Sequence, residues 1–264
     1  MNVLKFEFKQ SLKGQIGWVV ASLITLFLFL GLFNAYMSAK EAVVMILQGF
    51  PAEVLSAFSL DLEIFFSIEG YFLFALPFLY LVAGLQSANL SIQLFSKENR
   101  CKTNDFLFTK PMNRSTIFMA KVSVLLVFIV MSQVIMFIPT YLLMKTFDPD
   151  LSINYVLICS LTILLIQFFF ASLGTFVGTI LRRLKSVSIV AMLCVFSFYI
   201  ISLLESVVDN SILQLITPFC FFNQELLFTN QQLDLAMIVY CVVICLVLMG
   251  MTHTLYIKQD IHAV

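Results

Sequence analysis

Few residues in this 264-residue chain have the type and spacing needed for chemistry. Cys241 and Cys245 are four positions apart, which would place both thiols on one face of a helix and could suggest a metal pair. The run around them is apolar, so we interpret both as small apolar helix residues. His253 and His262 are the only histidines and make a weak case for a site. We predict no metal site and no catalytic residue.

Motifs for nucleotide binding and hydrolysis are missing from the sequence. There is no G-x-x-x-x-G-K-[ST] phosphate loop, and no glycine is followed by lysine. The metalloprotease pattern H-E-x-x-H and the nucleophile pattern G-x-S-x-G are also absent. We therefore predict that this chain is not an enzyme, binds no cofactor itself, and depends on energy supplied from outside.

The longest polar interruption of the chain, Ser96–Lys121, has an apolar cluster in its middle. A solvated loop between two membrane spans has no physical need of Phe106, Leu107 and Phe108. We interpret the segment as a docking surface for a partner protein. The basic residues around the cluster are Lys97, Arg100, Lys102, Lys110, Arg114 and Lys121.

The composition places the chain in a membrane. Hydrophobic residues make up 61% of it, charged residues only 11%, and the mean hydropathy is +1.02. Soluble proteins have roughly 45–50% apolar and about 25% charged residues. The apolar runs reach the roughly 20 residues that a helix needs to cross a bilayer, whereas barrel strands alternate over about 10. The predicted fold class is an all-α membrane protein.

Six apolar runs are long enough to span, and together they form one transmembrane domain over residues 1–264. Residues 1–15 are predicted to form a basic interfacial helix, and residues 96–116 a connecting loop. Residues 38–67 and 205–234 are moderately apolar and are expected to form amphipathic outer segments. The predicted spans are Ile16–Met37, Ile68–Asn89, Ile117–Met144, Ile153–Leu181, Ser186–Leu204 and Leu235–Ile257.

The charge distribution predicts the orientation. With both termini in the cytoplasm, only Lys40 and Lys145 of the 15 basic residues lie outside. This arrangement satisfies the positive-inside rule at every loop. The only acidic residues on the inner side are then Glu7, Glu98, Asp105 and Asp260.

The centres of the predicted spans carry no charge. Ionisable groups there would mark a proton- or ion-coupled carrier. Gln133 and Gln167 are the deepest polar side chains, and we expect them to form hydrogen bonds between helices. Gly174 and Gly178 form a small-xxx-small motif, which predicts close packing of the fourth span against another helix.

The polar segment resembles the first cytoplasmic loop of the permease subunits of type-2 ATP-binding-cassette exporters. Three positions depart from the family pattern: Lys102 and Ala120 replace glycines, and Asn113 replaces a serine. A second similarity to one exporter subgroup lies in Phe50–Asp61 and Glu69–Tyr71. The residues of the loop that carry the resemblance are Glu98, Thr103, Asp105, Phe106, Leu107, Phe108, Pro111, Arg114 and Lys121.

The resemblance implies a transporter subunit that works with a separate ATPase, which would hold ATP and magnesium. Asp105–Phe108 would be a coupling helix on that ATPase, while Arg114 and Lys121 would fix the loop against lipid phosphates or partner carboxylates. A second copy or a sister permease would complete the pathway, along the polar half of the second span and the fifth span. The cargo would be an exported amphipathic or lipophilic molecule such as a peptide, antibiotic or lipid.

Two other functions remain open from the sequence. A self-contained secondary carrier would transport alone and respond to ion gradients, and a membrane anchor or sensor would bind partners without transport. We expect a multi-pass protein of the bacterial plasma membrane, in contact with lipid and not with nucleic acid.

Overall fold

The computed structural model describes residues 2–51, 55, 64–101, 113–181, 184–208, 210–222, 224–229 and 231–258. Within these ranges the regular structure is helical and contains no strand. Six helices are long and apolar enough to cross a membrane. They are α1 (Asn2–Ser38), α4 (Ile68–Cys101), α6 (Arg114–Phe147), α7 (Ile153–Ile180), α8 (Val187–Val208) and α11 (Leu235–Lys258). The predicted all-α fold with six spans is confirmed.

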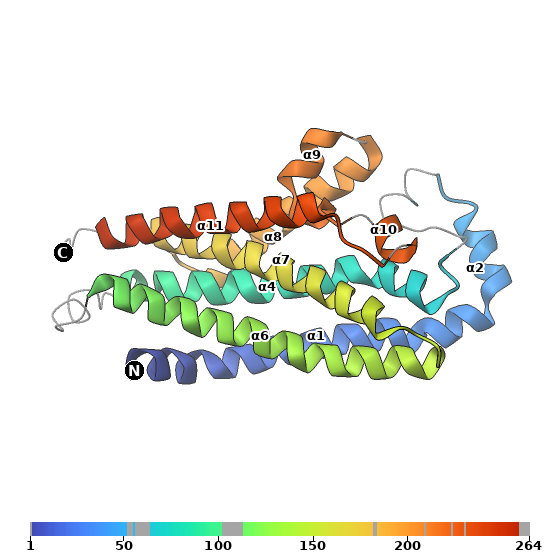
Figure 1. The fold of residues 1–264 in the computed structure, drawn as a ribbon, viewed down its shortest axis with the longest axis horizontal. Helices are drawn as coiled ribbons and strands as arrows, with labels where there is room; N and C mark the ends of the chain where they lie inside the picture. Colours follow the sequence, from blue (N-terminus) through green and yellow to red (C-terminus); the bar gives the residue numbers. More distant parts are fainter. Residues whose placement is uncertain are drawn as a thin grey trace.

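The long helices run side by side as one bundle (Figure 1). The start of α1, the end of α4, the start of α6 and the end of α11 lie at the same end, which we call the terminal end (Figure 1). The helices α4 and α7 form the centre, with α1, α6, α8 and α11 around them. In the most apolar stretch of α4, 61% of residues are buried, against 11% in α11.

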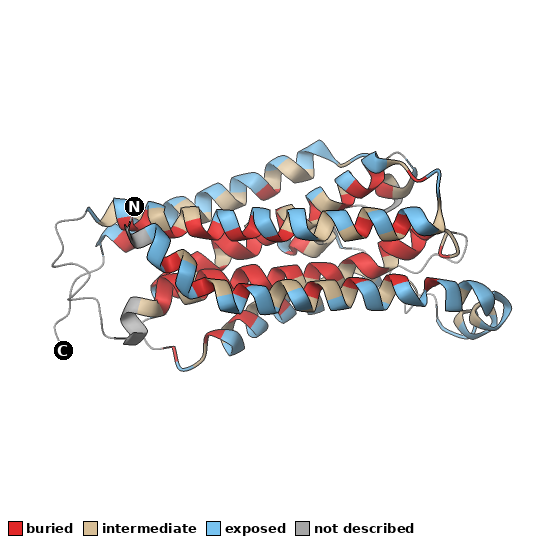
Figure 2. Cartoon of the chain, turned by 90° about the horizontal axis from the view of Figure 1, so that it is seen from below, coloured by how far each residue is buried: buried red, intermediate tan, exposed pale blue. Residues whose placement is uncertain are grey.

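The outward faces of the peripheral helices are apolar and exposed, as a lipid environment requires (Figure 2). Leu193 on α8 and Leu246 on α11 are examples, each more than three-fifths exposed. The buried residues form stripes that face the bundle interior (Figure 2). Exposed apolar area of this extent is expected against lipid or against another membrane helix.

The predicted leader helix and the first span are a single helix. Expected as a separate element over residues 1–15, the leader forms the first turns of α1. No proline interrupts the stretch, and Gly14 and Gly17 continue the helix. The leader is held from the side, since the ring of Phe8 stacks on Phe128 of α6 at 4.6 Å. The leader thus packs against the bundle, and its predicted position at the membrane interface stays a prediction.

The predicted connecting loop is shorter than residues 96–116. The helix α4 continues to Cys101, and α6 already begins at Arg114. Ser96 is fully buried, so this part of α4 still has packing partners. The connection between the two helices therefore comprises residues 102–113.

Part of the connection between α8 and α11 packs on the interior of the bundle, while α9 (Ser211–Ile216) is largely exposed. The other elements of the connection are the 3₁₀ helix η1 (Pro218–Cys220) and α10 (Gln224–Thr229). The ring of Phe219 lies 5.5 Å from Phe170, and Phe222 lies 6.4 Å from Tyr80. Phe170 and Tyr80 belong to the interiors of α7 and α4. This outer segment thus enters the bundle, whereas α2 (Lys40–Leu47), which follows α1, has no buried residue.

Gly174 and Gly178 lie where α7 meets α4. A Cβ atom on Gly174 would fall within 2.0 Å of Ser91 Oγ and 3.1 Å of the Ala88 carbonyl oxygen. A Cβ atom on Gly178 would lie 3.1 Å from the backbone of Ile92. The absence of side chains at these two positions lets the two central helices approach closely.

Candidate functional site

The predicted coupling residues divide into those that the structure describes and those that it does not. Arg114 and Lys121 are described, and Glu98 lies in the last turns of α4, with its side chain outside the described part. The others lie outside the described residues: Thr103, Asp105, Phe106, Leu107, Phe108 and Pro111. The site can therefore be built from its two flanks, the end of α4 and the start of α6.

Lys121 joins three helices inside the protein. It is fully buried on α6, and its Nζ donates to the carbonyl oxygen of Leu94 on α4 at 2.6 Å. The same Nζ lies 5.5 Å from the ring centre of Phe95 and 5.7 Å from that of Tyr256 on α11. Carbonyl and ring faces stabilise a cation removed from water. The expectation that Lys121 faces lipid phosphates or a partner is wrong, because it is buried.

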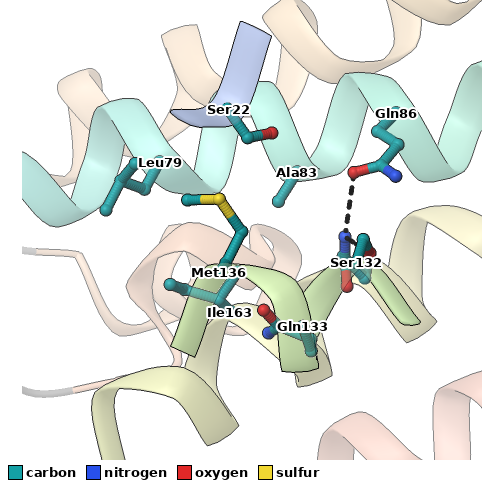
Figure 3. Close-up of a pocket in the computed structure, with 9 residues that line it drawn as sticks. Ser22, Leu79, Ala83, Gln86, Ser132, Gln133, Met136 and Ile163 are labelled. Atoms are coloured by element: carbon teal, nitrogen blue, oxygen red, sulfur yellow. Dashed lines mark hydrogen bonds between the residues drawn. The ribbon is translucent and has the colours of Figure 1, made fainter. Parts of the chain in front are cut away.

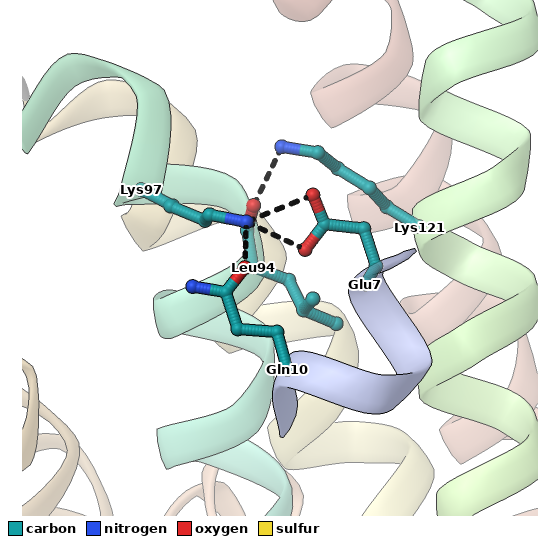
Figure 4. Close-up of polar contacts among 5 residues, drawn as sticks. All are labelled: Glu7, Gln10, Leu94, Lys97 and Lys121. Carbon is teal, nitrogen blue, oxygen red and sulfur yellow. Dashed lines mark hydrogen bonds and ion pairs between the residues drawn. The ribbon is translucent and has the colours of Figure 1, made fainter. Parts of the chain in front are cut away.

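A second contact fixes the end of α4 to α1. Lys97 Nζ lies 3.1 Å from both carboxylate oxygens of Glu7 and also donates to Gln10 Oε1 (Figure 4). It stands 4.6 Å above the centre of the Phe6 ring. Glu7 is only 4% exposed, so the pair is shielded from solvent. Figure 4 shows the side chains of Glu7, Lys97 and Lys121 converging on the same part of α4.

The start of α6 is attached to the end of α11. Arg114 Nη1 donates to the carbonyl oxygen of Ile257 at 2.8 Å. One turn earlier on α11, His253 Nε2 is hydrogen-bonded to Ser115 Oγ at 3.1 Å, and the His253 ring lies 5.0 Å from Phe118. A cation near the last carbonyls of a helix is favourable, because those groups carry partial negative charge.

The two helices next to the 102–112 segment are thus anchored to their neighbours. We call the anchoring residues the clamp: Glu7, Lys97, Arg114, Lys121 and Tyr256. Sequence reasoning treated Lys97 as a topology signal, assigned Lys121 to lipid phosphates or partner carboxylates, and gave Glu7 no role beyond an acid on the inner side. The one signal available was that Glu7 is an isolated acid among the lysines of the leader. These contacts hold the end of α4 to α1 and α6, and the start of α6 to α11.

The described residues contain no group of three or more His, Cys, Asp or Glu side chains that could hold a metal ion. Cys241 lies buried against α7, with its Sγ 4.0 Å from the carbonyl oxygen of Leu165. This placement agrees with the interpretation of this cysteine as a small packing residue.

The deep glutamines form interhelical hydrogen bonds, as predicted. Gln133 Nε2 on α6 donates to the Ser160 carbonyl oxygen on α7 at 2.8 Å. Gln167 Nε2 on α7 reaches Gln86 on α4 at 3.4 Å and Ser132 on α6 at 3.3 Å. Figure 3 shows this polar cluster.

The polar half of α4 lies inside this chain. Gln86, Ser87 and Ser91 are each at most 3% exposed. These three side chains therefore do not face a second permease, whereas Asn89 and Gln93 of the same half are partly exposed. Its polar groups are satisfied within the bundle instead, as in the 3.0 Å bond from Gln86 to Gln15 on α1.

A family model described as ABC-2 family transporter protein matches residues 1–261. No curated protein and no solved structure matches the chain.

Proposed function

Because the chain belongs to the ABC-2 family of transporter proteins, we propose that this permease subunit exports its substrate with energy from a separate ATPase. ATP and magnesium would bind to that ATPase. The observation that carries the proposal is the match over residues 1–261 together with six helices able to span a membrane. The expected setting is the bacterial plasma membrane, with both termini in the cytoplasm.

The ATPase is proposed to dock on the segment between α4 and α6. The apolar cluster Phe106–Phe108 supplies aromatic anchors of the kind that dominate protein interfaces. The clamp supports this proposal, because a push on the segment would reach α4 and α6 along the chain, and Lys121 ties these two helices to each other. Lys97 would pass the movement on to α1, and Arg114 would pass it on to α11. ATP-driven closure of the ATPase would then move α4 and α6 together.

The pairing face is proposed to include α8. Only 17% of the residues in its most apolar stretch are buried, and Ile189, Leu193 and Ile200 are all more than half exposed. A second copy or a sister permease would cover this face, and lipid would cover the rest. An apolar lining favours an amphipathic or lipophilic cargo such as a peptide, an antibiotic or a lipid.

The docking segment is tested by replacing Phe106 and Phe108 together with alanine. Loss of two buried aromatic anchors is expected to cost about 2 kcal/mol or more, or roughly 30-fold in Kd for the ATPase. Co-purification with the tagged chain and ATP hydrolysis in liposomes are the measurements. Phe50→Ala, an exposed phenylalanine distant in sequence from the docking segment, is the matched control and should change neither.

Unchanged capture of the ATPase by the double variant would contradict the docking proposal. Transport by the purified chain alone, driven by a proton or sodium gradient, would instead indicate a self-contained carrier. Binding of an ATPase with no flux in vesicles would indicate an anchor or sensor.

A further inference from the structure

Three lysines form a row on the exposed side of the start of α1. Lys5, Lys9 and Lys13 are four positions apart, so they lie on one face of the helix, and all three are exposed. We call them the lysine row. In the described part of the chain their ammonium groups make no ion pair or hydrogen bond. Like charges four positions apart on a helix repel one another, so the row is unfavourable unless an anionic partner lies beside it.

The opposite side of α1 is fixed to the bundle. Glu7, Ser11 and Gln15 form a buried row on this side, and each is 4% exposed. Glu7 pairs with Lys97 on α4 (Figure 4). One row position further along, the amides of Gln15 and Gln86 are hydrogen-bonded at 3.0 Å. The helix cannot turn about its axis without breaking these contacts, so the lysine row is held facing away from the bundle.

The lysine row continues the face of α1 that is exposed along the membrane span. Ile16 follows Lys13 after three positions, and the next apolar side chains follow at spacings of three or four, which keeps them on the same face. They are Val20, Ile24 and Phe27, and together with Ile16 they are 47% to 60% exposed. Hydrocarbon covers an exposed apolar stripe of this kind on a spanning helix. The lysine row therefore points towards the same lipid.

The spacing of the row along the helix matches the depth of the lipid headgroups. At 1.5 Å per residue, Lys13 lies about 4.5 Å beyond Ile16 along the axis, Lys9 about 10.5 Å and Lys5 about 16.5 Å. The headgroup layer is about 5–8 Å thick on each side of the hydrocarbon. Long lysine side chains extend along the helix towards that layer, and attraction to an anionic surface acts over a Debye length of about 8–10 Å beyond it. All three ammonium groups are thus within range of lipid phosphates.

We propose that the lysine row binds the phosphate groups of anionic lipids in the leaflet at the terminal end. Phosphates supply the negative charge that the three unpaired ammonium groups lack, and they remove the repulsion within the row. Phe6, next to Lys5, is 62% exposed and suits the boundary between headgroups and acyl chains. The site requires only that the chain spans a membrane, so it stands whether or not an ATPase docks at the terminal end.

The test compares an anionic with a zwitterionic lipid on the purified full chain in detergent. Phosphatidylglycerol at several times its Kd should raise the midpoint of thermal unfolding by roughly 2–4 °C more than the same amount of phosphatidylcholine, because a ligand of the folded chain stabilises it. Replacing Lys5, Lys9 and Lys13 together by glutamine should abolish this difference, and replacing them by arginine should keep it. A full difference in the glutamine variant overturns the proposal.

The matched control removes the same charge from three other exposed lysines. Lys40, Lys145 and Lys185 are exposed elsewhere on the chain, and replacing them together by glutamine should keep the effect of phosphatidylglycerol. Equal losses in the two triple variants would assign the effect to net charge and overturn the proposal.

Two further arms separate lipid from other sources of negative charge. Inorganic phosphate in place of lipid should not raise the midpoint, and a rise with phosphate alone overturns binding of lipid. The glutamine variant of the lysine row should still capture the ATPase. Loss of that capture together with an intact lipid effect would assign the row to an acidic protein surface and overturn the proposal.

Discussion

The central helix α4 is held in two different ways along its length. At the terminal end its contacts are charged: Lys97 pairs with Glu7, and Lys121 donates to the Leu94 carbonyl oxygen. In the middle its contacts are neutral, through the amide of Gln86 and the close approach to Gly174. Both regions are buried, yet only one contains ions.

The difference follows from the cost of burying charge. In the middle of a span an isolated cation costs roughly 2.5–3.5 kcal/mol on insertion scales, so neutral amides and close packing join the helices there. Near the end of the bundle a lysine has a carboxylate, helix carbonyls and aromatic rings within reach. In the described part of the chain, the charged contacts of α4 therefore lie at the end where the partner ATPase is proposed to bind, and neutral contacts hold its centre.

The largest effect is expected from breaking the neutral contact. Gly174→Leu would force a side chain into Ser91 and the backbone of Ala88. Overpacking of this kind costs about 3 kcal/mol or more, and little folded protein should be recovered. Size-exclusion chromatography and thermal unfolding measure it. Gly250→Leu on α11 is the control, because no atom lies within 4 Å of its Cβ position.

The smaller change Gly174→Ala isolates the cause. If the clash with Ser91 is responsible, Ser91→Gly in the Gly174→Ala background should recover part of the lost stability. Wild-type stability of Gly174→Leu would show that α4 and α7 do not pack as closely as described.

The second-largest effect is expected from replacing Lys121. Replacement by methionine keeps much of the side-chain volume and removes the charge-assisted hydrogen bond to Leu94 together with the ring contacts. We expect a loss of about 2 kcal/mol in the free energy of unfolding. Lys145→Met at the other end of α6 is the matched control, since that lysine is exposed and its hydrogen bond to the Tyr141 hydroxyl stays within the same helix. Equal stability of the two variants would contradict the clamp.

The neutral contacts were largely predictable from the sequence and the charged ones were not. Long apolar runs predict which helices cross the membrane, because a spanning segment must be apolar and satisfy its own backbone hydrogen bonds. The motif Gly174-x-x-x-Gly178 identifies a packing surface by itself. Glu7 and Lys97 are 90 positions apart, and no local pattern pairs them. Lys121 resembles every other lysine near a membrane boundary, so only the fold shows that it is buried.

The depth of the 205–234 segment in the bundle could not be predicted from the sequence either. Hydropathy identified residues 205–234 as moderately apolar, but it does not say whether Phe219 and Phe222 lie on the bundle or within it. Their ring contacts with α7 and α4 place them within it. The coupling function of Asp105–Phe108 stays a prediction, since these residues lie outside the described part of the chain.

The smallest effect is expected from Glu7→Gln, which keeps the shape of the side chain and removes its charge. The side chains of Lys97 and Glu7 are 15% and 5% exposed, so the pair should exceed an exposed ion pair and contribute about 1 kcal/mol. Glu41→Gln on the exposed α2 is the control and should have no effect. A double-mutant cycle with Lys97→Met separates the pair from its surroundings, and a coupling energy near zero would remove this contact from the clamp. Because the pair is shielded, the coupling should also persist in high salt, unlike that of a surface pair.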